Sequence, residues 1–351
     1  FLRGPLAFTT IQGSGGAPDS FLGTAGVDVI ALVNQTDATF LSARQANDTV
    51  QFNSFTNVLS AATLYGGQGN DQLTDTNVAG TLSASFVAQN EGNDTITLSG
   101  VTSSTIQGNE GNDAITIGGL LTSALVNGNQ GNDTLNVAQV SGGSVFGGSG
   151  FDQINVTGNQ TSARIQANND DDIITLGAGN TYNGSTINGN QGADSIIVNA
   201  ITGFATSTIF GGAGNDSINA ALSTVATVNL TISSDDGNDT VIDGAGADTI
   251  TNSAGNDNIT LNAGSNSFTA TAGNNNVTLG ATAVTTTNTV AFATGNDTIN
   301  GAAAQGNLVI TDTAGANTLI GGAVVDSITG GNGRDTITGG LAADSLTGGA
   351  G

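Results

Sequence analysis

The tripeptide Gly111-Asn112-Asp113 decides the fold of this chain, because close variants of it recur at nearly regular intervals. Each variant ends in aspartate, and the series continues as Gly131-Asn132-Asp133, Gly150-Phe151-Asp152, Gly192-Ala193-Asp194, Gly214-Asn215-Asp216 and Gly237-Asn238-Asp239. When Asp172 is included, successive aspartates lie between 19 and 23 residues apart. A short segment that repeats at such a period is the sequence signature of a solenoid.

Apolar residues keep fixed positions relative to these aspartates. One lies seven residues before each aspartate and another two residues after it, so the two series are nine residues apart. The first series is Leu64, Val87, Ile106, Val126, Val145, Ile165, Ile187, Ile209 and Ile232, and the second is Leu73, Ile96, Ile115, Leu135, Ile154, Ile174, Ile196, Ile218 and Val241. The return to the next coil takes 10 residues after Ile96 but 14 after Ile218. We therefore expect one turn of constant length and one loop of variable length in each coil.

From Gly237 onward a nine-residue unit runs with almost no loops, as in GNDTVIDGA, GADTITNSA and GNDNITLNA. This pattern predicts three parts: an entry segment outside the repeats (1–18), coils of roughly 20 residues (19–236), and nine-residue repeats (237–351) interrupted at 282–294. The sequence starts at Phe1 without a signal-like region, which favours a segment of a longer or processed protein.

Charge and composition restrict the partners of the chain. There are 28 acidic but only 4 basic residues, which gives a formal net charge of −24. This balance excludes the binding of nucleic-acid phosphates and favours a cation. Cysteine and histidine are absent, so the usual zinc and copper ligands are missing and a calcium site made of oxygen atoms fits best. No apolar stretch is long enough to span a membrane.

The residues of the turns themselves favour calcium. Glycines at alternate positions let the backbone adopt conformations closed to other residues, and this exposes carbonyl oxygens. An aspartate at the end of the turn adds an anionic oxygen, and stacked coils bring two such turns together at about 4.8 Å. Calcium accepts six to eight oxygen ligands, whereas magnesium requires a tighter octahedral geometry.

The complete turns, such as Gly66-Gly67-Gln68-Gly69-Asn70-Asp71 and Gly330-Gly331-Asn332-Gly333-Arg334-Asp335, resemble the G-G-x-G-x-D-x-U-x nonapeptide of the repeats-in-toxin (RTX) family. This resemblance implies an all-β fold, a right-handed parallel β-roll or β-helix solenoid, with calcium-binding GGxGxD turns. It also implies that several Ca²⁺ ions bind between successive turns and that the chain is secreted by a bacterium.

The aspartate of each turn is the predicted calcium ligand. The candidates are Asp71, Asp94, Asp113, Asp133, Asp152, Asp172, Asp194, Asp216, Asp239, Asp248, Asp257, Asp297, Asp326, Asp335 and Asp344. Three asparagines (Asn266, Asn275 and Asn317) and Leu308 take the aspartate position elsewhere, so calcium is not expected there. In 167–172 and 234–239 acids replace the leading glycines, which strengthens or distorts those sites.

One alternative interpretation applies to the aspartates and another to the threonines. Asp and Asn suit turns because both tolerate left-handed backbone, but asparagine would do this without the repulsion of stacked carboxylates. Threonines beside the apolar series, as in Thr95-Ile96-Thr97, form either a ligand array for ice or sugar or an ordinary solvated β-face. The phenylalanines are interpreted as core or loop packing.

Catalysis is not expected. Paired acids occur at Asp170-Asp171-Asp172, but Lys, His and Cys are absent and the arginines Arg3, Arg44, Arg164 and Arg334 are far apart in the sequence.

The sequence thus predicts a calcium-binding extracellular structural segment of a surface layer, fibre or adhesin, secreted or at the bacterial cell surface. The alternative is a passive repeat region of a secreted toxin or hydrolase. Expected partners are calcium ions, further copies of the chain in an oligomer or head-to-tail fibre, and a cell-surface polysaccharide. Nucleic acid is not an expected partner.

Overall fold

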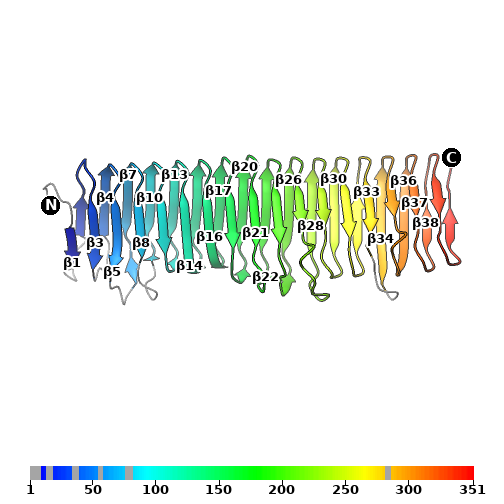
Figure 1. Cartoon of the computed structure of the whole chain (residues 1–351), viewed down its shortest axis with the longest axis horizontal. Helices are drawn as coiled ribbons and strands as arrows, with labels where there is room; N and C mark the ends of the chain where they lie inside the picture. The colour runs from blue at the N-terminus through cyan, green and yellow to red at the C-terminus, as the bar shows by residue number, and fades with distance from the viewer. Residues whose placement is uncertain (1–8, 13–18, 34–38, 54–57, 76–81, 281–285) are drawn as a thin grey trace. The chain divides into compact units, whose positions relative to one another are not determined.

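A computed structural model describes residues 9–12, 19–33, 39–53, 58–75, 82–280 and 286–351. It consists of two units, Phe1–Asp172 and Ile173–Gly351. The described residues of each unit form β-strands that belong to two parallel sheets, A and B, and equivalent strands of successive coils lie side by side (Figure 1). The expected all-β parallel solenoid is therefore confirmed. The described part of the chain contains no helix of the length and apolarity needed to span a membrane.

The first unit contributes strands to both sheets. In sheet A these are β1 (Thr9–Gln12), β3 (Val29–Val33), β5 (Thr49–Asn53), β6 (Leu59–Ser60), β8 (Gln72–Asp75), β9 (Leu82–Ser83), β11 (Thr95–Leu98), β12 (Val101–Thr102), β14 (Ala114–Thr122), β16 (Thr134–Ser141), β18 (Gln153–Val156) and β19 (Gln160–Thr161). In sheet B they are β2 (Asp19–Leu22), β4 (Thr39–Gln45), β7 (Thr63–Gln68), β10 (Phe86–Glu91), β13 (Thr105–Glu110), β15 (Leu125–Gln130), β17 (Ser144–Ser149) and β20 (Arg164–Asn169).

The second unit repeats this arrangement. Its sheet A strands are β21 (Ile173–Leu176), β22 (Thr181–Asn183), β24 (Ser195–Val198), β25 (Gly203–Ala205), β27 (Ser217–Asn219), β29 (Thr240–Ile242), β31 (Asn258–Leu261), β33 (Asn276–Leu279), β35 (Thr298–Asn300), β37 (Thr318–Ile320) and β39 (Thr336–Thr338). Its sheet B strands are β23 (Thr186–Gln191), β26 (Thr208–Ala213), β28 (Thr231–Asp236), β30 (Thr249–Ala254), β32 (Ser267–Ala270), β34 (Thr287–Thr294), β36 (Asn307–Ala314), β38 (Ser327–Thr329) and β40 (Ser345–Thr347).

The core contains the two apolar series read from the sequence, together with further buried residues of sheet A such as Ile117 and Leu121. Ile106 in sheet B pairs in register with Val87 and Val126, and Ile115 in sheet A pairs with Ile96 and Leu135. All six side chains are fully buried. Because successive residues of a strand point to opposite faces, the neighbours of each core residue face outward. The nine-residue separation is thus the path from sheet B, through the constant turn, into sheet A.

Two segments that were expected to lie outside the repeats form strands. Residues 9–12 of the expected entry segment are β1, which pairs with β3, and the rest of that segment lies outside the described residues. The expected interruption at 282–294 contains β34, which pairs with β32 and β36. Val290 and Phe292 of β34 point inward opposite Phe268 and Ala270, so their alternation provides core residues although the glycine signal is missing.

A prediction concerns the stacked core. Ile115→Ala removes a fully buried side chain and should lower the free energy of unfolding by about 2–5 kcal/mol, the usual range for a large core residue replaced by alanine. Thr116→Ala, on the outer face of the same strand, is the control and should change it by no more than ~0.5 kcal/mol. Chemical denaturation in calcium-containing buffer measures both, and equal effects would contradict the assignment of the core.

Candidate calcium-binding turns

The constant turns join each sheet B strand to the next sheet A strand. In the turn between β13 and β14, Gly111 has a φ of 124°, a region that favours glycine. A Cβ at Gly111 would also collide with the carbonyl group of Gly92 in the preceding coil. Glycine is therefore required at position 111 for two reasons: the backbone conformation and the close approach of the neighbouring coil.

The aspartates of these turns form a continuous hydrogen-bonded column. The backbone N–H of each aspartate donates to Oδ1 of the aspartate in the following coil. In the first unit the distances are 2.6 Å from Asp28 to Asp48, 2.8 Å from Asp48 to Asp71, 2.6 Å from Asp71 to Asp94, 2.7 Å from Asp94 to Asp113, 2.7 Å from Asp113 to Asp133, 2.8 Å from Asp133 to Asp152 and 2.6 Å from Asp152 to Asp172. One oxygen of each accepting carboxylate is thus used by the fold itself.

The asparagines that precede these aspartates form a second column. The backbone N–H of Asn112 donates to Oδ1 of Asn93 in the preceding coil at 2.8 Å, and Asn132 donates to Asn112 at 2.8 Å. Asn93, Asn112 and Asn132 do not adopt the left-handed backbone for which Asn and Asp suit turns. Oδ1 of Asn93 and of Asn112 instead accepts a backbone N–H from the neighbouring coil, as Oδ1 of each aspartate does. This contact leaves the second carboxylate oxygen without a role.

That second oxygen is buried and has no hydrogen-bond partner in most turns of the column. This holds for Oδ2 of Asp48, Asp71, Asp94, Asp113, Asp133 and Asp152 in the first unit and of Asp216, Asp239, Asp297 and Asp335 in the second. A buried carboxylate oxygen without a donor is costly. A cation bound beside these oxygens would offset this cost.

The space beside the free oxygen is built from further oxygens. A Cβ placed on Gly211 would lie 2.5 Å from Oδ2 of Asp216 in its own turn and 2.7 Å from the carbonyl oxygen of Ser234 in the next coil. A Cβ on Gly108 would likewise meet Oδ2 of Asp113 and the carbonyl oxygen of Gly128. Carboxylate and carbonyl oxygens from two coils thus converge where glycine leaves room, and this donor set fits calcium.

Burial also changes the acidity of the column. Loss of water raises the pKa of Asp113 from 3.8 to about 6, and that of Asp94 and Asp152 to about 7. The pKa of Asp133 rises to about 8, mainly through burial and further through the charges of Asp152 and Asp113. Without a cation, these groups would hold protons at pH values where an exposed aspartate is ionised.

In the described part of residues 62–207, the opposite edge of the coils has no aspartate column. In some coils a serine hydroxyl takes the place of the carboxylate, whereas Ala124, Gly143 and Ala163 stand at this position in others. Ala62 donates its backbone N–H to Oγ of Ser85 at 3.0 Å, and Ser85 donates to Oγ of Ser104 at 2.9 Å. In the second unit Ser185 donates to Oγ of Ser207 in the same way at 2.9 Å. The same backbone contact is therefore made without an anion.

From Leu230 onward the opposite edge also carries the aspartate motif, with interruptions. Leu230 donates its backbone N–H to Oδ1 of Asp248 at 2.6 Å, and Asp248 donates to Oδ1 of Asn266 at 2.9 Å. Leu308 donates to Asp326 at 2.8 Å, and Asp326 to Asp344 at 2.9 Å. Leu230, Asn266 and Leu308 therefore occupy aspartate positions, and Asn288, which accepts from Asn266, does so too.

Some turns already contain a donor for their carboxylate. The side-chain amide of Asn252 donates to Oδ2 of Asp257, and the backbone N–H of Gly322 donates to Oδ2 of Asp326 at 2.6 Å. Asn275 donates its amide to Asp297 at 3.1 Å and Asn317 to Asp335 at 3.0 Å, although only to Oδ1. The turns of Asp257 and Asp326 are thus the least in need of a cation.

The structure places all fifteen predicted aspartates at turns. Six (Asp71, Asp94, Asp113, Asp133, Asp152 and Asp172) belong to the column of the first unit, and six (Asp194, Asp216, Asp239, Asp257, Asp297 and Asp335) lie in the equivalent turns of the second unit. The other three (Asp248, Asp326 and Asp344) lie on the opposite edge of the second unit. The sequence analysis missed Asp28 and Asp48, which belong to the column of the first unit. The spacing would have found both, because Leu41 lies seven residues before Asp48 and Val50 two after it.

The acids that replace leading glycines have varied roles. Asp170 accepts a hydrogen bond from the backbone N–H of Gly150 at 2.9 Å, and Asp235 accepts one from Oγ of Ser233. Asp243 and Asp312 were not recognised from the sequence. Both are buried, and burial raises the pKa of Asp243 to about 8 and that of Asp312 to about 6.

The groups considered for other functions lie on the outer faces of the sheets. The guanidinium of Arg164 stacks over the ring of Phe146 at 5.3 Å, on the outer face of sheet B. On sheet A, Thr74, Thr97 and Thr116 align in successive coils, but Asn136 takes the next position. The threonine array is thus short and mixed with amides.

Comparison with known proteins agrees with this geometry. The family model for the RTX calcium-binding nonapeptide repeat matches residues 63–74, 157–182, 203–222, 231–259, 251–282 and 320–351. These segments are RTX repeats. The chain is thus a calcium-binding repeat protein, as the resemblance of its turns implied.

A solved structure shares the fold. It is the X-ray crystal structure of a hyperactive, Ca²⁺-dependent, β-helical antifreeze protein from an Antarctic bacterium, with 19% sequence identity and a TM-score of 0.51. The match covers 93% of this chain and 84% of that one. None of the curated proteins is significantly similar to the chain in sequence.

A prediction follows from the acidity of the RTX turns. In chelator, the folded carboxyl groups keep protons up to pH values of about 6 to 8, whereas unfolded aspartates lose theirs near ~4. The folded state then binds more protons, so its free energy of unfolding should fall as the pH rises from about 4 to about 8.

In saturating calcium the dependence should reverse, because protons must displace bound ions before they reach the carboxylates. Thermal melts at several pH values, with chelator and with calcium, measure both trends. A calcium-free protein that becomes more stable as the pH rises would contradict the assignment of these turns.

Proposed function

We propose that this chain is a structural module outside the cell that folds into a rigid form when calcium occupies its RTX turns. The observation that carries this proposal is the column of buried aspartates whose Oδ2 atoms have no donor. Most coils of the first unit add one such group, so the number of cations needed grows with the number of these coils. Several ions are therefore proposed to bind, one between successive turns of the column.

Each proposed calcium ion is held by atoms of two coils. In the turn of Asp216 these are the carboxylate Oδ2 and the carbonyl oxygen of Ser234, which converge on the space beside Gly211. The ion would neutralise the carboxylate and join neighbouring coils more tightly than the backbone hydrogen bonds alone. Such coupling of binding to folding is expected for sites that the unfolded chain does not possess.

An extracellular role is supported by the combination of high acidity and calcium turns. A net charge of −24 opposes compaction unless cations are abundant, and calcium is abundant outside cells. Within this proposal the chain acts as part of a surface layer, fibre or adhesin and is not itself an enzyme. Exposed apolar side chains such as Val27, Leu222 and Val325 support contacts with further copies.

A passive repeat region of a secreted toxin or hydrolase is the second candidate. The RTX matches support both roles, because they identify calcium-binding repeats and not the protein that carries them. The variable returns favour the structural role, since they give each coil its own surface. A hydrolytic activity or membrane lysis by the complete natural protein would favour the second candidate.

The first test of the proposed function is removal of calcium. Chelation should cause a loss of β-structure, because the repulsion between buried carboxylates is no longer offset. Far-ultraviolet circular dichroism in chelator and in millimolar calcium measures it, with magnesium as the control ion. Identical spectra in chelator and calcium would refute the proposal.

A second test compares two aspartates that differ in their donors. Asp113→Asn keeps the Oδ1 atom that accepts from Asp94 at 2.7 Å but removes the charge of a carboxylate whose Oδ2 is free. Asp257→Asn is the matched control, because Asn252 already donates to Oδ2 of Asp257.

The first substitution should remove about one calcium ion per chain, since carboxylates supply the anionic ligands of calcium sites. The second should leave the calcium content almost unchanged. Elemental analysis of protein purified in calcium measures the bound ions, and equal losses in the two variants would disprove the role given to Oδ2.

A further inference from the structure

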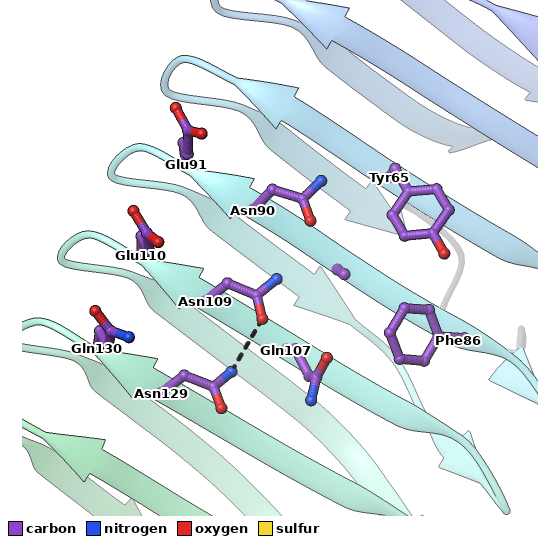
Figure 2. Close-up of a pocket in the computed structure, with 10 residues that line it drawn as sticks. Tyr65, Phe86, Asn90, Glu91, Gln107, Asn109, Glu110, Asn129 and Gln130 are labelled. Carbon is purple, nitrogen blue, oxygen red and sulfur yellow. Dashed lines mark hydrogen bonds between the residues drawn. The ribbon is translucent and has the colours of Figure 1, made fainter.

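A hollow on the outer face of sheet B has no role in the proposed function. It reaches the turn edge, where Asn90 and Glu91 take the positions that Gly67 and Gln68 hold in their six-residue turn. It has a volume of ≈ 500 Å³ and crosses β7, β10, β13 and β15 of the first unit. Figure 2 shows that its lining is arranged in rows, with aromatic side chains at one side, amides in the middle and carboxylates at the turn edge. We propose that this hollow, named the amide groove, binds a neutral oligosaccharide.

The aromatic side of the amide groove is preformed. Tyr65 packs edge to face against Phe86, with ring centroids 5.9 Å apart and an interplanar angle of 62°, and Phe40 packs on the other side of Tyr65 with the same values. Tyr65 and Phe86 are half-buried, so part of each ring faces the solvent. Partly exposed aromatic side chains offer the apolar surface on which the C–H groups of a sugar ring stack.

The amides in the middle row are fixed by backbone and by hydrogen bonds. Asn90, Asn109 and Asn129 have φ values of 80°, 87° and 83° and occupy the same register position in three successive coils. The amide of Asn129 donates to Oδ1 of Asn109 at 3.3 Å (Figure 2), and Asn127 donates to Asn129 at 2.6 Å. Each amide offers donors and acceptors of the kind that hydroxyl groups require.

The length of the amide row sets the size of the ligand. Its neighbours in the same register are Gly67 on one side and Gly148 on the other, and neither has a side chain. The row therefore spans three coils at a strand spacing of about 4.8 Å. This spacing is close to the rise of one pyranose residue in an extended glycan, so about three sugar units fit the row.

The charge of the lining decides between ligand classes. No basic residue is among the side chains that line the groove, so an anionic glycan is not expected. Glu91 and Glu110 are exposed at the turn edge, and the amides separate them from Tyr65 and Phe86 (Figure 2). A small cation cannot contact the carboxylates and the aromatic rings together, as it does in an aromatic cage. The separation favours a neutral ligand that lies across the amides.

The chain provides its own reporter for the test. It contains no tryptophan and two tyrosines, of which Tyr65 lines the groove and Tyr182 is fully buried. In a Tyr182→Phe background, tyrosine fluorescence reports on Tyr65 alone. We would titrate cellohexaose, xylohexaose, laminarihexaose, maltohexaose and the hexamer of N-acetylglucosamine in saturating calcium, with polygalacturonate and tetramethylammonium as charged controls.

At least one neutral hexasaccharide should change the Tyr65 fluorescence. Phe86→Ala and Asn109→Gly should each weaken its affinity by about tenfold, the effect of one lost stacking or hydrogen-bonding contact. Asn109→Gly preserves the backbone because glycine occurs at this register position in Gly67 and Gly148. Glu110→Gln, and Phe210→Ala on the same sheet in the second unit, are the controls and should change the affinity by less than about twofold.

Three outcomes would overturn the inference: no neutral hexasaccharide binds, binding is unaffected by Phe86→Ala and Asn109→Gly, or only tetramethylammonium binds and Glu110→Gln abolishes it. The inference needs folded coils, but it does not need the aspartates to be the calcium ligands. Circular dichroism of each variant in calcium separates the two failures, because loss of β-structure concerns the calcium turns and loss of binding in a folded variant concerns the groove.

Discussion

A single contact, the backbone N–H of one turn aspartate donated to Oδ1 of the next, constrains most of this structure. It fixes the register of neighbouring coils, and it also stacks one carboxylate above another inside the protein. Two unit charges one strand spacing apart repel by about 3 kcal/mol at the effective dielectric constant near a protein surface. Burial is the main cause of the raised pKa values of the column, and at Asp133 the charges of Asp152 and Asp113 raise the pKa further. Any stable form of the coils must therefore include protons or cations.

The number of stacked, buried carboxylates, and with it their repulsion, differs between the two edges of the coils. In several coils between residues 62 and 207 the opposite edge makes the same backbone contact with serine hydroxyls, which carry no charge. After Leu230 both edges carry the motif, but Asn266, Asn275 and Asn317 interrupt the carboxylates. In one turn the side-chain amide of Asn252 donates a hydrogen bond to Oδ2 of Asp257, so this oxygen has a partner without a cation. The backbone contact is thus shared by both edges, and the charge of the side chain that accepts it varies.

Most of the fold could be predicted from the sequence, because the nine-residue separation of Ile106 and Ile115 recurs and corresponds to one strand, one turn and the start of the next strand. The fold and the calcium-binding RTX repeats are confirmed, while ligation by individual aspartates stays a prediction. Asp28 was left out although Gly26-Val27-Asp28 keeps the G-x-D pattern, whereas Asp48 was missed because its turn lacks glycine, although the spacing of apolar residues is intact. The strand β34 was missed for the same reason. The donors of Asp257 and Asp326 could not be predicted, because they depend on which atoms meet across a turn.

The outer faces of the sheets do not obey the core constraint, so most outward positions are free to vary. The amide row lies where sheet B enters the turns, at the register position of Gly67 and Gly148. Residues such as Gln107 and Asn127 face outward in register, where the fold accepts almost any side chain that forms β-structure. Asparagine at a positive φ is more strained than glycine in the same backbone conformation. Glycine does occur in this row, at Gly67 and Gly148. Three consecutive asparagines between two glycines therefore retain side chains where the backbone does not need them. The amide groove is the place where those side chains, with Tyr65 and Phe86 beside them, have a use.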